Sequence, residues 1–136
     1  MSLPTYITFK TELARDRSVH LCEKVVTVLA AMAKWCDLEK VPLMLTDTVS
    51  TAEEDAQLER VSDEHRTCRA VDISVRGWTA DQITRFLAVF RDRYGYLGAI
   101  SKKNNTPNLL VYHEGTAFHI HVQVNHKYGY QWKESA

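Results

Sequence analysis

Apolar and polar side chains alternate in two short stretches of the chain, and this alternation predicts two strands. In residues 118–124 every second side chain is apolar, so a strand there has one apolar face and one polar face that carries His119 and His121. Residues 68–75 alternate in the same way, and Asp72 falls on the polar face of that strand. The apolar rows belong in a core, and the polar rows must face a site or water.

Two longer stretches have a helical period. Apolar residues recur at helical spacing after Ser18, a plausible N-cap, and predict an amphipathic core helix that runs to about Asp37. A second helix is predicted between Thr79, which caps it, and Gly95, because its apolar and aromatic residues also share one face.

Shorter segments complete the expected architecture. Residues 102–107 have a strong turn composition, and residues 114–116 form a link short enough for a hairpin. Residues 47–64 are polar and acid-rich, and they form either one wall of a cleft or a solvated loop with an isolated helical turn. The aromatic residues of the tail after Asn125 either pack over the sheet or frame a groove. Further strands are expected at residues 6–9 (an edge strand), 43–45, 96–101 and 108–113.

These elements predict a single domain of α+β class over residues 1–136. A length of 136 residues suits one domain with a real core. We expect a small, mostly antiparallel sheet packed with the two main helices.

The polar faces of the two alternating strands predict a metal site. If these strands are neighbours, Asp72 and His121 share a face, and His65 enters from the preceding loop. Zinc accepts imidazole nitrogen and carboxylate oxygen, and a catalytic zinc site has three protein ligands and one open position. His65, Asp72 and either His119 or His121 can supply the three ligands, which leaves Glu114 as the general base.

These motifs resemble the paired signatures of the hedgehog/DD-peptidase fold. The similarity covers roughly residues 41–125 and rests on His65 ahead of Arg-Ala-Val-Asp-Ile, and on Val-Tyr-His-Glu leading to His-Ile-His. It implies that His65, Asp72 and His121 are zinc ligands, that Glu114 is the catalytic acid–base residue and that His119 faces the substrate or supports a ligand. The family's zinc carboxypeptidases, dipeptidases and phage endolysins imply a peptidoglycan peptide as substrate.

The chain departs from the peptidase pattern at several positions. Cys68 stands where a glycine is usual, and Ser62 lies three residues before His65 instead of two. The strand at 43–45 lacks the usual oxyanion-stabilising arginine, for which Arg60, Arg66 or Arg69 could substitute. Many peptidases of this fold also place their acid three residues before the last ligand, where this chain has Phe118. Two alternatives therefore stay open, a non-catalytic zinc-binding interaction module and a phage structural protein with a vestigial site.

Composition narrows the choice of partners. Seventeen lysines and arginines balance seventeen aspartates and glutamates, so no overall field attracts nucleic acid or an anionic membrane surface. No apolar stretch approaches the length of a membrane span, and the oligomeric state is left open. Three cysteines without a paired motif, and no signal-peptide pattern, indicate a chain made in the cytoplasm. An endolysin of this kind must be released by another route to reach the cell wall.

Overall fold

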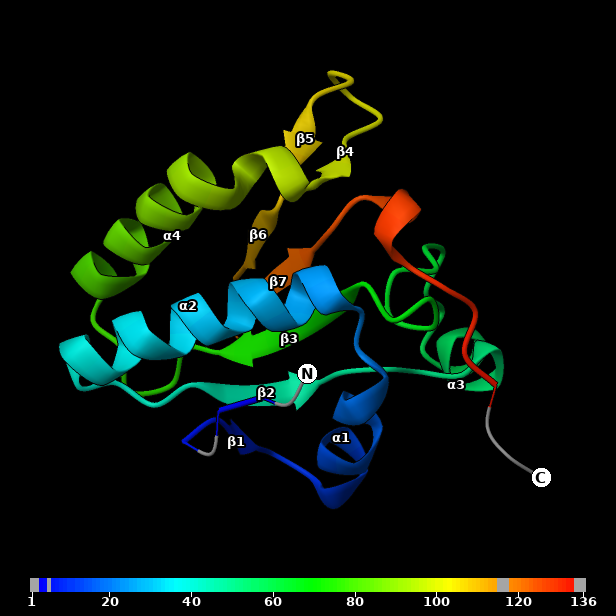
Figure 1. Cartoon of the computed structure of the whole chain (residues 1–136), viewed down its shortest axis with the longest axis horizontal. Helices are drawn as coiled ribbons and strands as arrows, with labels where there is room; N and C mark the ends of the chain where they lie inside the picture. Colours follow the sequence, from blue (N-terminus) through cyan, green and yellow to red (C-terminus); the bar gives the residue numbers. More distant parts are fainter. Residues whose placement is uncertain (1–2, 5, 115–117, 134–136) are drawn as a thin grey trace.

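The computed structural model describes residues 3–4, 6–114 and 118–133, and its centre is a five-stranded sheet (Figure 1). The strand order is β1-β2-β3-β7-β6, with β1 parallel to β2 and every other neighbouring pair antiparallel. The fold is therefore α+β with a mostly antiparallel sheet, as predicted. The strands of the sheet are β1 (Thr8–Phe9), β2 (Met44–Asp47), β3 (Ala70–Ser74), β7 (His119–Gln123) and β6 (Leu110–His113).

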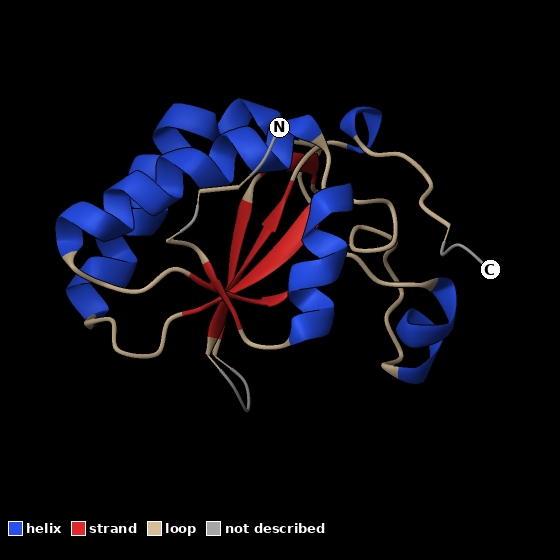
Figure 2. Cartoon of the chain, turned by 60° about the horizontal axis from the view of Figure 1, so that its bottom comes forward, coloured by secondary structure: helices blue, strands red, loops and turns tan. Residues whose placement is uncertain are grey.

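Two long helices, α2 (Glu23–Glu39) and α4 (Ala80–Tyr94), cover one face of this sheet (Figure 2). The apolar rows of β3 and β7 lie beneath them, fully buried, and pack against the apolar residues of both helices. The predicted alternation is thus confirmed within both strands, but Phe118, predicted in the apolar row, lies before β7 and is exposed. The residues at the centre of this core are Val25, Leu29, Met32, Val71, Ile73, Phe86, Phe90, Ile120 and Val122.

The predicted start of the first long helix is wrong. Ser18–His20 form a separate 3-10 turn after α1 (Glu12–Arg17), and Leu21 then adopts an extended conformation. Helix α2 begins only after Cys22, whose backbone N–H donates to the carbonyl of Cys68 at 2.8 Å. The apolar period continues across this break, so spacing alone did not reveal it.

The second long helix agrees with the prediction at both ends. Thr79 caps α4 in a capping box, because its hydroxyl accepts from the Gln82 N–H and the Gln82 side chain accepts from the Thr79 N–H. The helix ends at Gly95, which opens a 3-10 turn at Gly95–Leu97.

The strand predicted at residues 108–113 is divided in two. Its first part, β5 (Pro107–Asn108), pairs with β4 (Ala99–Ile100) in a separate ribbon, and its second part is β6. The two parts have different pairing partners. Strand β5 pairs with β4 outside the main sheet, whereas β6 pairs with β7 within it. The predicted link at residues 114–116 lies mostly outside the described residues, but the strands on either side of it pair antiparallel, as in a hairpin.

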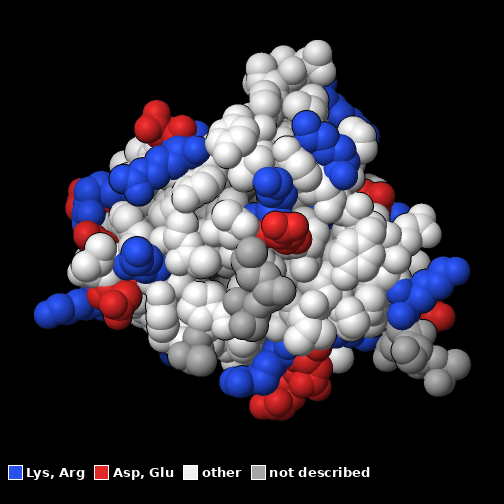
Figure 3. All heavy atoms as spheres, viewed as in Figure 1, with Lys and Arg blue, Asp and Glu red and all other residues white. Residues whose placement is uncertain are grey.

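The acid-rich segment after β2 contains a short helix, α3 (Ala52–Gln57), with a capping box between Thr51 and Glu54. The chain then continues through turns into β3. On the side of the molecule seen in Figure 3, lysines and arginines are interspersed with acidic residues, without a large patch of one sign. Within the described ranges, no helix has the length and apolar character to span a bilayer.

Candidate metal centre

Strands β3 and β7 bring Asp72 and His121 together on the face of the sheet opposite α2 and α4. The two residues are direct partners in the antiparallel register, and Nδ1 of His121 lies 2.9 Å from Oδ1 of Asp72. Their neighbours Ile73 and Ile120 are likewise paired, on the opposite, buried face. The alternation of the two strands therefore separates a core from a polar site.

His65 reaches the same place from the turn before β3. Its side chain is only 5% exposed, and its Nε2 lies 3.4 Å from Oδ2 of Asp72. The turn is held by backbone hydrogen bonds from Thr67 to Asp63 and from Cys68 to His65. Cys68 has a φ of 65°, the left-handed conformation that glycine adopts most easily. A glycine at this position would adopt the same conformation without strain.

Cys68 is a buried hydrophobic residue and lies outside the metal-binding group. Burial raises the pKa of its thiol to about 11, although a hydrogen bond with Tyr130 partly opposes this. A thiol with that pKa is protonated at neutral pH, and its sulfur is not among the convergent donor atoms of the described residues. The structure therefore favours an inert, buried role for Cys68.

The outer nitrogen of each histidine is held by an oxygen acceptor. Nδ1 of His65 lies 2.7 Å from the carbonyl oxygen of Thr48, and Nε2 of His121 lies 3.1 Å from Oε1 of Gln123. The Gln123 amide is itself oriented, because its nitrogen donates to the carbonyl of Asn108 at 3.0 Å. Since these oxygens only accept, the outer nitrogens carry the protons of the neutral imidazoles.

The inner atoms of the site are consequently all acceptors. In the neutral histidines, Nε2 of His65 and Nδ1 of His121 carry lone pairs, and both face the carboxylate of Asp72. Only a proton or a metal ion makes such a convergence attractive. The three residues offer donor atoms within 4.8 Å of one another. Two imidazoles, a carboxylate and an oriented outer shell fit a zinc ion.

Contacts within the triad favour the charged forms of Asp72 and His65. Burial opposes ionisation of Asp72, but hydrogen bonds from His121 and His65 outweigh it and hold the pKa of the carboxyl far below its usual range. Burial alone lowers the pKa of His65, but the hydrogen bond and charge of Asp72 outweigh it and raise that pKa. In the absence of metal, the Asp72 carboxylate therefore favours protonation of His65.

A hollow of about 700 Å³ lies over the triad, and its lining includes Glu114 and His119. Glu114 is exposed at the end of β6, and Nε2 of His119 lies 3.9 Å from Oδ1 of Asp72. The predicted catalytic residues thus line the same hollow as the predicted ligands. His119 does not belong to the group of convergent donors, so the register selects His121 from the pair.

His113 also lines this hollow. Its ring lies 4.8 Å from that of His119 and 6.3 Å from that of His121, between centroids. Burial and the two neighbouring histidines lower the pKa of His113, so its imidazole is neutral at neutral pH. The register of β6 with β7 places it there, opposite His119.

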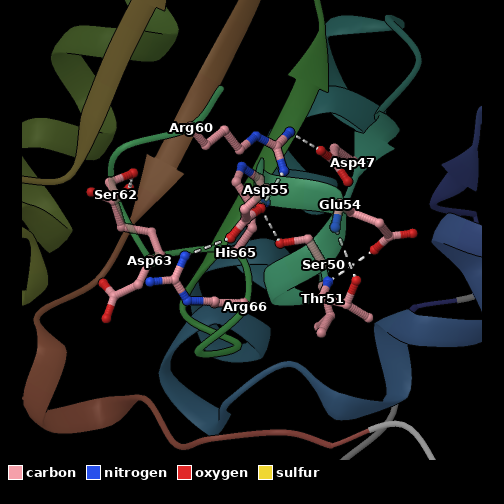
Figure 4. A network of polar contacts seen from close by, with 12 residues as sticks. Asp47, Ser50, Thr51, Glu54, Asp55, Arg60, Ser62, Asp63, His65 and Arg66 are labelled. Carbon is pink, nitrogen blue, oxygen red and sulfur yellow. Dashed lines mark hydrogen bonds and ion pairs between the residues drawn. The ribbon is translucent and has the colours of Figure 1, made fainter. Parts of the chain in front are cut away.

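Arg60, Ser62 and Glu64, which follow α3, line the hollow over the triad. A network of ion pairs and hydrogen bonds holds this segment against α3 and β2 (Figure 4). Asp55 is nearly inaccessible, and its carboxylate accepts from Ser50 at 2.6 Å and pairs with Arg60 and Arg66, both at 3.1 Å. Arg60 also pairs with Asp47 at the end of β2. The segment therefore combines the two expected arrangements, since its last residues line the hollow while α3 is an isolated short helix.

The network also distinguishes among Arg60, Arg66 and Arg69, the three arginines that could stabilise an oxyanion. Arg60 lines the hollow over the triad. Arg66 turns to Asp55 and a different hollow, and Arg69 donates to the carbonyl of Val124 and pairs with Asp63. Arg60 is therefore the candidate that the structure brings to the site.

The aromatic tail packs away from the triad. The Trp132 ring lies 5.0 Å from that of His20, and Tyr130 donates to the backbone carbonyl of the same histidine. The guanidinium of Arg17 stands over the Trp132 ring at 5.2 Å. Neither aromatic residue lines the hollow over the triad.

Comparisons of the chain with protein-family models, with curated proteins and with solved structures yield no significant match. The similarity to the hedgehog/DD-peptidase fold consequently rests on the sequence motifs, and it stays a prediction.

Proposed function

We propose that the protein is a zinc-dependent peptidase that hydrolyses peptide bonds of bacterial cell-wall peptidoglycan. The observation that carries this proposal is the convergence of His65, Asp72 and His121, with both outer imidazole nitrogens already bound to oxygens. Such an arrangement orients the ligands before the metal arrives, and outer-shell contacts of this kind strengthen metal binding. The substrate class comes from the motif similarity alone.

His65, Asp72 and His121 would hold the zinc ion. When bound, zinc supplies Lewis acidity, which polarises a carbonyl and brings the pKa of water from about 16 toward 7. Three ligands leave one position for water or substrate, as catalytic zinc sites require. A structural zinc site normally has four protein ligands, and among the described residues only these three converge. This favours the peptidase over the non-catalytic zinc-binding module.

Glu114 is the proposed general base. Its carboxylate stands at the open rim of the hollow, where it can accept a proton from water and later donate it to the leaving amine. Proton transfer of this kind contributes roughly 100-fold to 10,000-fold to a rate. His113 and His119 are the alternative bases, since both line the same hollow.

Arg60 is the proposed stabiliser of the carbonyl oxygen as negative charge develops on it. Its guanidinium is fixed between Asp47 and Asp55, so it is oriented before the substrate binds. Arg60 would take the role of the arginine that the strand at β2 lacks. His119 would contact the substrate beside the reacting bond.

The test is the Glu114→Gln variant, compared with wild type on purified peptidoglycan. Gln keeps the shape of the side chain but cannot act as a base. We expect an unchanged zinc content and a loss of at least about 100-fold in the release of new amino termini. Unchanged activity would assign the base to His113 or His119, and loss of zinc would assign Glu114 to the ligands.

The route to the substrate is part of the same proposal. A phage endolysin made in the bacterial cytoplasm would meet peptidoglycan after release through the membrane, which agrees with the motif similarity. Nothing in this route changes the chemistry at the site.

A further inference from the structure

The hollow over the metal centre continues into a second hollow of about 1030 Å³. The two share Arg60, Asp72 and His119 in their linings. The first extends over β7 and β6, and the second extends over β2 and past the ends of β1 and β3. Together they form one groove that crosses the strands of the open sheet face, with the triad near its middle.

The two ends of this groove differ in charge. Glu64 and Glu114 line the first hollow, whereas Lys10 and Arg76 line the second, Lys10 just beyond the end of β1 and Arg76 just beyond the end of β3. Lys10 follows β1 by one residue and Arg76 follows β3 by two, so both come from short connections at the sheet. Both side chains are exposed.

Lys10 and Arg76 also differ from Arg60, the third cation of the second hollow. Arg60 is neutralised by ion pairs with Asp47 and Asp55. Among the residues that the structure describes, no carboxylate forms an ion pair with Lys10 or Arg76. The one acidic residue lining this hollow is Asp72, whose oxygens already face the histidines. Two uncompensated cations in one concave surface create a positive potential that attracts an anion.

We infer that Lys10 and Arg76 form a carboxylate-binding subsite in the second hollow, so that the preferred substrate is an acidic peptide lying across the sheet with its carboxylate between the ends of β1 and β3. This inference rests on the proposed peptidase function. Strand β1 is two strands from β3, or about 10 Å, and an extended peptide covers that distance in about three residues. The carboxylate therefore lies within about three residues of the reacting bond. Met44, Leu58 and Phe118 supply apolar contacts to the part of the peptide between the reacting bond and the carboxylate.

The test compares a synthetic peptidoglycan stem peptide that has free carboxylates with the same peptide in which every carboxylate is an amide. We would measure kcat/KM for both peptides with wild type and with the double variant Lys10→Gln/Arg76→Gln. The matched control is Lys34→Gln/Arg93→Gln, which removes one exposed lysine and one exposed arginine from α2 and α4 on the opposite side of the sheet. Equilibrium binding of both peptides would be measured in the zinc-loaded Glu114→Gln background.

We expect wild type to prefer the acid peptide by about tenfold, because two solvent-accessible charge pairs together contribute a factor of this order. The preference should disappear in the Lys10→Gln/Arg76→Gln variant, persist in the control and decrease as salt is added. Equal kcat/KM for the two peptides with wild type, or an acid preference that survives in the double variant, would overturn the subsite.

The outcomes also separate the subsite from the proposed function. Cleavage of both peptides at equal rates would leave the peptidase intact and refute only the subsite. Binding that favours the acid peptide, without cleavage of either peptide, would refute the peptidase and support the subsite.

Discussion

Strands β3 and β7 have one apolar face and one polar face, and the two faces lie in different surroundings. On one face, Ile73 and Ile120 are paired beneath the long helices and fully buried. On the other, Asp72 and His121 are paired in a groove, with side chains 13% exposed. The first face is part of a core in which many apolar residues contribute to stability. The metal site on the second face depends on three side chains and on two oxygen acceptors. We therefore expect mutations on the two faces to separate stability from metal binding.

The largest effect on stability should come from Ile120→Ala, adjacent in sequence to the metal ligand His121. Removing a fully buried isoleucine side chain leaves a cavity and lowers the free energy of unfolding by about 2–5 kcal/mol. The fraction that stays folded should keep its zinc. Denaturant unfolding and elemental analysis of the same preparation check this, and a change of less than about 1 kcal/mol would contradict the assignment of Ile120 to the core.

The pH dependence of stability should differ between the zinc-free and zinc-loaded protein. Because the pKa of His65 is raised by folding, its contribution is present below the unfolded value of about 6.5 and is lost as pH rises through the folded pKa. Zinc binding requires the unprotonated imidazole, so zinc affinity should increase over the same window.

Thermal unfolding from about pH 5.5 to 8.5, with and without a chelator, measures this difference. We expect the zinc-free protein to lose stability toward high pH while the stabilisation by zinc grows. Parallel curves in the two states would show that His65 does not exchange a proton for the metal.

The smallest effect should come from Cys68→Gly. Glycine removes the strain of a positive φ, roughly 1 kcal/mol, but loses the burial of the thiol, which is of similar size. The free energy of unfolding should change by less than about 1 kcal/mol, and the zinc affinity should stay the same. A fall in zinc affinity of tenfold or more would identify Cys68 as a ligand.

Much of the fold and the core of the candidate site follow from local pattern. The alternation around Asp72 and His121 was sufficient to predict two strands with one polar face each, and the β3–β7 pairing then brings these residues together. The choice of His121 over His119 as a donor agrees with the motif similarity. This choice depends on the pairing register of β3 with β7, which is a long-range property that the spacing of residues along the chain does not reveal.

Other features of the site depend on groups that have no sequence signal. The acceptor for His65 is the backbone carbonyl of Thr48, and any residue type has such a carbonyl. Arg60 reaches the groove because Asp47 and Asp55 hold it there, which only the folded loop decides. The start of α2 was placed too early for a related reason, since the extended conformation of Leu21 interrupts the helix without interrupting its apolar period.

The most direct test of the metal centre is the zinc content of tag-free protein, measured by elemental analysis for wild type, His121→Ala and the control His126→Ala. His126 is exposed in the short 3-10 turn after β7 and does not line the groove. We predict about one zinc per chain in wild type and in His126→Ala, and none in His121→Ala. Wild type without zinc, or His121→Ala that retains it, would contradict the metal centre described here.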